Sequence, residues 1–249
     1  SSREGDESVH FTGELLSDAS HFTDDTVLTI ATAYTWAVHG DLEANYRECI
    51  RDYRSLGFSE SMSQWADGVG EQQYFNLGNG AAIRVSPVAV FAESLDDAIL
   101  LARNSASVTH YNELAVRLAE LVGGATFLAH NQYAPADIHD FAVEYCPSLF
   151  QLPRPGTPFQ WASVVTAIEI ACGTSSFEAC MRECISAGGD VDSVCAMAGA
   201  ISDGLWGGPP PLLTYVLEEL KRCHPDLFRM LRLAWLGGGI PQDRSLISG

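Results

Sequence analysis

Basic residues are scarce in this sequence. It has 14 Lys and Arg against 32 Asp and Glu in 249 residues, so its formal net charge is −18. A surface of this charge repels nucleic acid and anionic membranes, which argues against polyanion binding as the function. An anionic small molecule would need a local positive source on the protein.

Long apolar runs are missing too. No window approaches the length of a transmembrane helix, and the N-terminus lacks the basic-then-apolar layout of a signal peptide. The seven cysteines are an odd number without a CxxC pair. Cys180 and Cys184 are four apart on one predicted helical face, but no second pair matches them, which argues against a zinc site. Reduced, buried thiols fit an intracellular setting, and we expect a cytoplasmic protein.

The sequence also lacks convincing period-2 strand runs and internal repeats. With 47% hydrophobic residues the chain can bury a large core. The apolar spacing predicts an all-α fold of roughly ten helices, packed orthogonally around a buried central set. No polar or Pro/Gly-rich linker divides the chain, so we expect a single domain over residues 1–249. An N-terminal arm over residues 1–20 and a mobile tail over 237–249 would flank its helices.

Capping and turn residues predict several helix boundaries. Asp41 and Ser94 each precede an apolar-periodic stretch and are predicted N-caps. Residues 81–93 are predicted to form one helix, kinked at Pro87. Residues 147–158 carry four prolines and are predicted to be a surface loop.

Two short acidic runs organise the candidate site. Thr23-Asp24-Asp25-Thr26 and Gly188-Gly189-Asp190-Val191-Asp192-Ser193 each precede a strongly apolar stretch, so each is predicted to begin a buried helix. One such run alone is most simply explained as helix capping. Two runs brought to one point would gather four carboxylates, which repel each other unless cations neutralise them. An oxygen-rich shell of this kind suits Mg²⁺, Mn²⁺ or Ca²⁺.

The spacing within each run allows two cations. Adjacent residues at a helix start, such as Asp24 and Asp25, diverge by about 100°. One carboxylate can therefore face one ion while its neighbour reaches another. Asp190 and Asp192 offer a second pair, followed by the hydroxyl of Ser193. Ions on the order of 4 Å apart would bind oxygens and activate a water between them.

Both runs lie in longer stretches that resemble a known family. HFTDDTVLTIATAY resembles the first metal motif of the ADP-ribosylglycohydrolases, and SAGGDVDSVCAMAGAISDGLWG resembles their second. The resemblance implies the all-α fold of that family and two Mg²⁺ or Mn²⁺ ions. The implied metal ligands are Thr23, Asp24, Asp25, Asp190, Asp192 and Ser193. Among them, Asp25 and Asp192 are the implied catalytic residues.

Three further segments follow the family in order and spacing. Residues 75–84 are similar to its Gly-Asn-Gly-x-x-Met-Arg segment, and residues 107–110 resemble its Ser-x-x-Thr-His segment. Trp161 and Ser163 resemble the helix before the second metal motif. The implied substrate-binding residues are Phe75, Asn76, Leu77, Gly78, Asn79, Gly80 and His110. Judged alone, His110 would more often be a structural histidine. Arg84 would more often pair with an internal Asp, and is left outside the site.

The resemblance implies a metal-dependent hydrolase that cleaves the glycosidic bond at C1″ of an ADP-ribosyl group. Its partner would be an ADP-ribosylated protein or small acceptor; we expect a monomer that binds neither nucleic acid nor membrane. The resemblance does not extend to the N-terminus. Family members normally carry a Gly-Asp-Ala-Leu-Gly helix followed by a Glu. Here only 22 residues precede Thr23, and they do not contain that motif. Three explanations stay open: the segment was removed, this family member never had it, or Glu4, Glu7 or Glu14 substitutes for the Glu. Two alternatives stay open: an ADP-ribose-binding relative without turnover, and a helical scaffold whose acidic runs are only caps.

Overall fold

The computed structural model describes residues 11–17, 20–69, 78–151 and 159–238. This part of the chain forms fourteen α-helices and one 3-10 helix, and it contains no β-strand. The predicted all-α class is therefore confirmed. None of the described helices is both long enough and apolar enough to cross a membrane.

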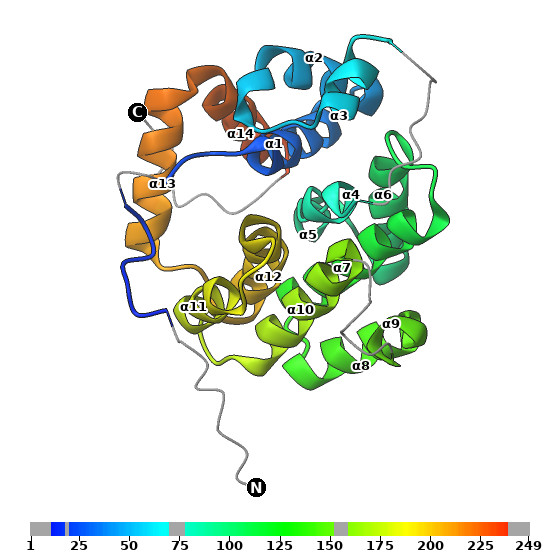
Figure 1. Cartoon of the computed structure of the whole chain (residues 1–249), viewed down its shortest axis with the longest axis vertical. Coiled ribbons are helices and arrows are strands. Elements are labelled where there is room, and N and C mark those ends of the chain that lie inside the picture. The colour runs from blue at the N-terminus through cyan, green and yellow to red at the C-terminus, as the bar shows by residue number, and fades with distance from the viewer. Residues whose placement is uncertain (1–10, 18–19, 70–77, 152–158, 239–249) are drawn as a thin grey trace, which may run out of the picture.

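Helices from the two ends of the chain share one core. The first three are α1 (Asp24–Ala37), α2 (Leu42–Asp52) and α3 (Glu60–Ala66), with the 3-10 turn η1 (Arg54–Leu56) between α2 and α3. Helix α1 packs directly against α14 (Pro225–Gly237), which in turn packs against α13 (Pro210–Cys223) (Figure 1). Val27, Ile50, Trp65 and Leu227 are among the buried residues of this cluster.

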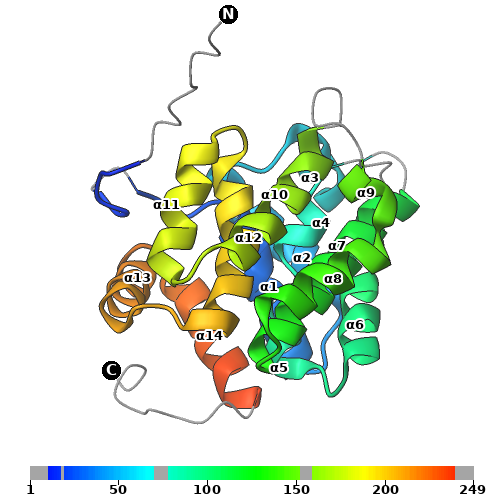
Figure 2. The same cartoon turned by 90° about the horizontal axis from the view of Figure 1, so that it is seen from below.

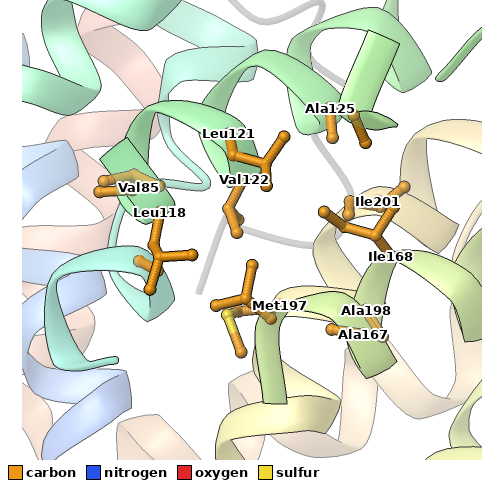
Figure 3. Close-up of a cluster of buried hydrophobic side chains, with 14 of the residues drawn as sticks. Val85, Leu118, Leu121, Val122, Ala125, Ala167, Ile168, Met197, Ala198 and Ile201 are labelled. Atoms are coloured by element: carbon orange, nitrogen blue, oxygen red, sulfur yellow. The ribbon is translucent and has the colours of Figure 1, made fainter. Parts of the chain in front are cut away.

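The middle of the chain builds a second, larger core. Its helices are α4 (Gly80–Ile83), α5 (Val88–Phe91), α6 (Leu95–Ser107), α7 (Glu113–His130), α8 (Pro135–Tyr145), α9 (Pro147–Gln151), α10 (Phe159–Gly173), α11 (Phe177–Ala187) and α12 (Val191–Trp206). In α7, every residue from Ala115 to Ala129 except Arg117 is buried. Figure 3 shows Leu121 and Val122 of α7 facing the side chains of α10 and α12.

Helix α12 is the element of this second core that carries the downstream acidic run. It packs against α7, α10 and α11, and it lies between α10 and α11 when the molecule is seen from below (Figure 2). Met197, Ala198 and Ile201 of α12 are fully buried. The start of α12 is thereby fixed in space by three neighbouring helices.

Two predicted boundaries hold and two do not. Asp41 accepts from the N–H of Ala44 at 2.8 Å and Ser94 from that of Asp97 at 3.2 Å, so both predicted caps are confirmed. The single helix predicted over residues 81–93 is wrong, because Pro87 ends up as the N-cap of a separate helix, α5. The loop predicted over residues 147–158 is also wrong in its first part. There Pro147 begins α9, at a position where a missing N–H costs nothing; residues 152–158 lie outside the described part.

The described part of the predicted N-terminal arm lies against α11. The N–H of Phe11 donates to Ser186 Oγ at 2.8 Å, and Arg182 donates to the carbonyl oxygen of Gly13 at 2.7 Å. Glu14 is exposed in this segment. Glu4 and Glu7, as well as tail residues 239–249, lie outside the described residues.

Candidate functional site

The two acidic runs begin α1 and α12. Asp24 and Asp25 are the first two residues of α1, Asp190 is the N-cap of α12, and Asp192 lies in its first turn. The negative charges of Asp190 and Asp192 raise the pKa of both Asp24 and Asp25. The four carboxylates, which come from the two different cores, therefore lie within electrostatic reach of one another.

Burial and repulsion from neighbouring carboxylates make Asp24 and Asp25 difficult to ionise. Burial, together with the charges of Asp24, Asp192 and Asp190, raises the pKa of Asp25 to about 7. Burial also raises the pKa of Asp24, partly offset by backbone hydrogen bonds. A carboxyl group in such surroundings is stabilised by either a proton or a cation.

Capping by the N-cap side chain does not account for either run. Thr23 and Asp190 occupy the N-cap positions of α1 and α12, but neither side chain accepts a capping hydrogen bond. Ser176, at the start of neighbouring α11, does accept one, from the N–H of Ala179 at 3.1 Å. The Thr23 hydroxyl and the Asp190 carboxylate thus accept no capping hydrogen bond from the backbone of their own helices.

Asn79 connects the Gly-Asn-Gly segment to the second acidic run. Its Nδ2 donates to Asp190 Oδ2 at 2.7 Å and to Ser163 Oγ at 2.9 Å. Asn79 is 9% exposed, so this contact is largely shielded from water. A Cβ on Gly80 would meet no atom within 4 Å, so the backbone there faces open space. Gly78 is half-buried before α4; Phe75, Asn76 and Leu77 lie outside the described residues.

Gly57 is a site residue that the sequence did not reveal. Its φ of +109° is left-handed, and a Cβ at this position would lie 3.2 Å from Asp24 Oδ1. The backbone conformation therefore favours glycine, and a methyl group added there would crowd the Asp24 carboxylate. A glycine that ends a short helix is a recognisable signal, but nothing in the local sequence links it to Asp24.

The turn into α12 also depends on glycine. Gly188 and Gly189 have φ values of +69° and +77°, and they carry the chain from α11 to Asp190. Ser193, the third residue of α12, is 5% exposed beside Asp192. Both φ values lie in the left-handed region, which favours glycine at this turn.

His110 and Arg84 share a buried polar cluster. His110 is 2% exposed, and its Nδ1 lies 2.8 Å from Thr109 Oγ1. Burial and the nearby Arg84 charge lower the pKa of His110 to about 3, so the ring is neutral at pH 7. His110 Nε2 has no hydrogen-bond partner within the described chain. No hydrogen bond among the described residues joins His110 to the four aspartates.

The expectation that Arg84 pairs with an Asp is wrong. Arg84 is fully buried, donates to Ser105 O at 2.6 Å and Thr109 Oγ1 at 2.8 Å, and stacks on Tyr46 with 4.5 Å to the ring centre. It forms no ion pair with any residue in the described ranges. Aromatic stacking and hydroxyl acceptors take the place of a carboxylate.

The oxygen donors fit a hard divalent cation in type. Carboxylates and hydroxyls are the ligands that Mg²⁺ and Mn²⁺ prefer. No group of three or more His, Cys, Asp or Glu side chains among the described residues is drawn together tightly enough to hold a metal. The four aspartates are thus close enough to repel one another, but are not gathered into a closed ligand shell.

A cavity of about 430 Å³ lies next to the first run in sequence. His21 and Phe22, which precede Thr23, line it together with Tyr215 and Arg222 of α13 and with His224. The His224 ring meets Phe22 edge to face, with 5.9 Å between the ring centres. Aromatic and basic side chains therefore border the chain segment that enters the acidic site.

The family model for ADP-ribosylglycohydrolase matches residues 3–236. ADP-ribosylhydrolase ARH3 from Homo sapiens is 28% identical over 184 residues, which cover 53% of this chain and 51% of the relative. ARH3 from Bos taurus is 27% identical, with 53% and 50% covered. The chain thus spans about half the length of the curated relatives it matches.

A solved structure described as "ADP-ribosylglycohydrolase-related protein complex" has the same fold. It superposes with a TM-score of 0.65 at 21% identity, covering 85% of this chain and 82% of that one. The match to the family model extends over nearly the whole described structure, including both acidic helix starts. This chain therefore belongs to the ADP-ribosylglycohydrolase family.

Proposed function

We propose that this protein hydrolyses the glycosidic bond at C1″ of an ADP-ribosyl group attached to a protein or small acceptor. The observation that carries the proposal is the meeting of two acidic helix starts whose N-cap side chains make no capping hydrogen bond. Family membership and the likeness to ARH3 support the same chemistry.

In this proposal six oxygen-bearing side chains would hold two Mg²⁺ or Mn²⁺ ions. They are Thr23, Asp24, Asp25, Asp190, Asp192 and Ser193. Bound ions would neutralise the carboxylates and lower the pKa of a coordinated water. Without a cation, Asp25 would be only partly ionised at pH 7, because burial and the neighbouring aspartates raise its pKa to about 7. Asp25 and Asp192 are the proposed catalytic residues, since they can accept a proton beside the reacting centre.

The substrate's diphosphate would lie near the Gly-Asn-Gly segment. The backbone at Gly78 and Gly80 can approach an anion closely, and the open space beside Gly80 leaves room for it. His110 is neutral at pH 7, so it would offer a hydrogen bond rather than a positive charge. Phe75, Asn76 and Leu77 complete the proposed substrate-binding segment.

A second candidate function is binding of ADP-ribose without turnover. The charges around Asp24 and Asp25 favour this second function. Among the described residues, they all come from other aspartates. No glutamate of that part of the chain is among the charges that raise the pKa of Asp24 or Asp25. Such a protein would keep both the cations and the ligand.

Release of free ADP-ribose separates the two functions. The full chain is incubated with a serine- or arginine-linked ADP-ribosylated protein, in Mn²⁺ or in EDTA. A hydrolase releases ADP-ribose only in Mn²⁺, and Asp190→Asn or Asp192→Asn abolishes the release. A binding protein shows a higher Tm with Mn²⁺ and ADP-ribose but releases nothing. If the wild-type protein shows neither effect, both candidate functions are wrong.

A further inference from the structure

We propose that Asn79 is a positioning residue that holds the carboxylate of Asp190 in place for a cation. The inference rests on the proposed function, in which Asp190 is a metal ligand. It differs from the expectation that Asn79 is a substrate-binding residue. The geometry of three separate chain segments carries it.

Both hydrogens of the Asn79 amide are engaged. Nδ2 donates to Asp190 Oδ2 at 2.7 Å and to Ser163 Oγ at 2.9 Å. Asn79 is the N-cap of α4, Ser163 lies on α10, and Asp190 is the N-cap of α12. The Ser163 contact orients the amide, and the amide in turn orients one oxygen of Asp190. The other carboxylate oxygen, Oδ1, is left for a cation.

Asp190 needs a partner outside its own helix. It follows two left-handed glycines and makes no capping hydrogen bond, so local structure does not fix its side-chain rotation. The charges of Asp24 and Asp25 also repel it. An amide donor stabilises the ionised carboxylate without cancelling its charge. A Lys or Arg in the same place would neutralise it and compete with the cation.

This geometry also limits what Asn79 can do for a ligand. With both amide hydrogens donated to protein oxygens, only its Oδ1 remains, and that atom is an acceptor. An Asn79 side chain in this arrangement cannot donate to a diphosphate without releasing Asp190. Loss of Asn79 should therefore weaken cation binding rather than ADP-ribose binding.

Mn²⁺ titration followed by electron paramagnetic resonance tests this separation. Asn79→Ala should weaken Mn²⁺ binding by about 10- to 100-fold, the usual effect of removing a group that orients a metal ligand. Ser163→Ala should weaken it less, because Asp190 keeps its own hydrogen bond. At saturating Mn²⁺, Asn79→Ala should bind ADP-ribose as tightly as the wild type.

The control is Asn112→Ala, which removes another asparagine from a helix N-cap. Asn112 accepts from the N–H of Leu114 at 3.0 Å and belongs to no part of the acidic site. This variant should lose stability and keep its Mn²⁺ affinity. The proposal is overturned if Asn79→Ala binds Mn²⁺ as tightly as Asn112→Ala, or if it loses ADP-ribose affinity at saturating Mn²⁺. If Asn79→Ala does not fold, Asn79→Leu keeps the volume and removes the same donors.

A double-mutant cycle in EDTA separates failure of this inference from failure of the proposed function. Denaturant midpoints are compared for Asn79→Ala, Asp190→Ala and the pair, with no metal present. Non-additive shifts support the Asn79–Asp190 contact, whether or not the wild type binds Mn²⁺. A wild type that binds no Mn²⁺ contradicts the proposed function. Additive shifts overturn the positioning role whatever the protein binds.

Discussion

At the scale of single residues, Gly57 leaves room for the Asp24 carboxylate. A Cβ at this position would lie 3.2 Å from Asp24 Oδ1, and the φ of +109° disfavours any residue other than glycine. Gly68 has a comparable φ of +74°, but a Cβ there would meet no atom within 4 Å. The two glycines share a backbone conformation and differ in what lies opposite them.

Gly57→Ala should therefore affect both stability and cation binding. The left-handed conformation costs about 1–2 kcal/mol for alanine, and the added methyl group pushes Asp24 away from its position. Gly68→Ala should show a similar loss in urea unfolding while keeping the wild-type Mn²⁺ affinity. Equal Mn²⁺ affinities in the two variants would show that Gly57 has no part in placing Asp24.

Asp25 should make the metal-free protein less stable as the pH rises. Its pKa is raised from 3.8 to about 7, so the unfolded chain is ionised at pH 5–6 while the folded chain still holds the proton. The folded state binds more protons, and the free energy of unfolding falls between pH 4 and pH 7. In EDTA, Asp25→Asn should remove this fall in stability, which urea midpoints measured between pH 4 and pH 7 would show. Saturating Mn²⁺ should also remove it, because the cation binds the ionised form.

At the scale of helices, a buried chain of polar groups joins the two cores. Thr32 of α1 lies 2.6 Å from the hydroxyl of Tyr46 in α2, and that hydroxyl lies 2.8 Å from Ser105 Oγ in α6. Arg84, just after α4, donates to the carbonyl oxygen of Ser105 and covers the Tyr46 ring. Burying a guanidinium is costly, so hydrogen bonds and stacking must offset the lost solvation.

Arg84→Ala should lower the free energy of unfolding by about 3 kcal/mol or more, because it leaves a cavity and unsatisfied oxygens. Arg84→Met keeps most of the volume and removes the buried charge, so its loss should be smaller. Urea unfolding measures both. Arg222→Ala, which breaks only an exposed pair with Glu219, should leave the midpoint unchanged. If Arg84→Ala resembles Arg222→Ala, Arg84 does not hold the helices together.

At the scale of the whole molecule, the acidic site lies where the two cores meet. Asp24 and Asp25 begin α1, which packs against α14 at one end of the molecule. Asp190 and Asp192 begin α12, which packs against α7 in the other core. A cation held by both sets would oppose separation of the cores and relieve the repulsion between the carboxylates.

Mn²⁺ should accordingly raise Tm. At a free Mn²⁺ concentration a hundredfold above its Kd, the folded state should gain about 2.7 kcal/mol. Asp24→Asn in one core and Asp192→Asn in the other should each remove most of the shift in scanning calorimetry. Asp96→Asn, which changes an exposed carboxylate in the first turn of α6, should retain it. A shift that survives in either site variant would mean that the cation binds elsewhere.

Local sequence alone is enough to specify the helical class, the capped boundaries at Asp41 and Ser94, and the acidic starts of two buried helices. These features depend on local hydrogen bonding and apolar spacing, which neighbouring residues specify. Three other features come from the packing of the helices: Gly57 lies opposite Asp24, Asn79 donates to Asp190, and Arg84 stacks on Tyr46 instead of pairing with a carboxylate. Each of these contacts joins segments far apart in the chain, so its partners are set by how the helices pack and not by sequence spacing.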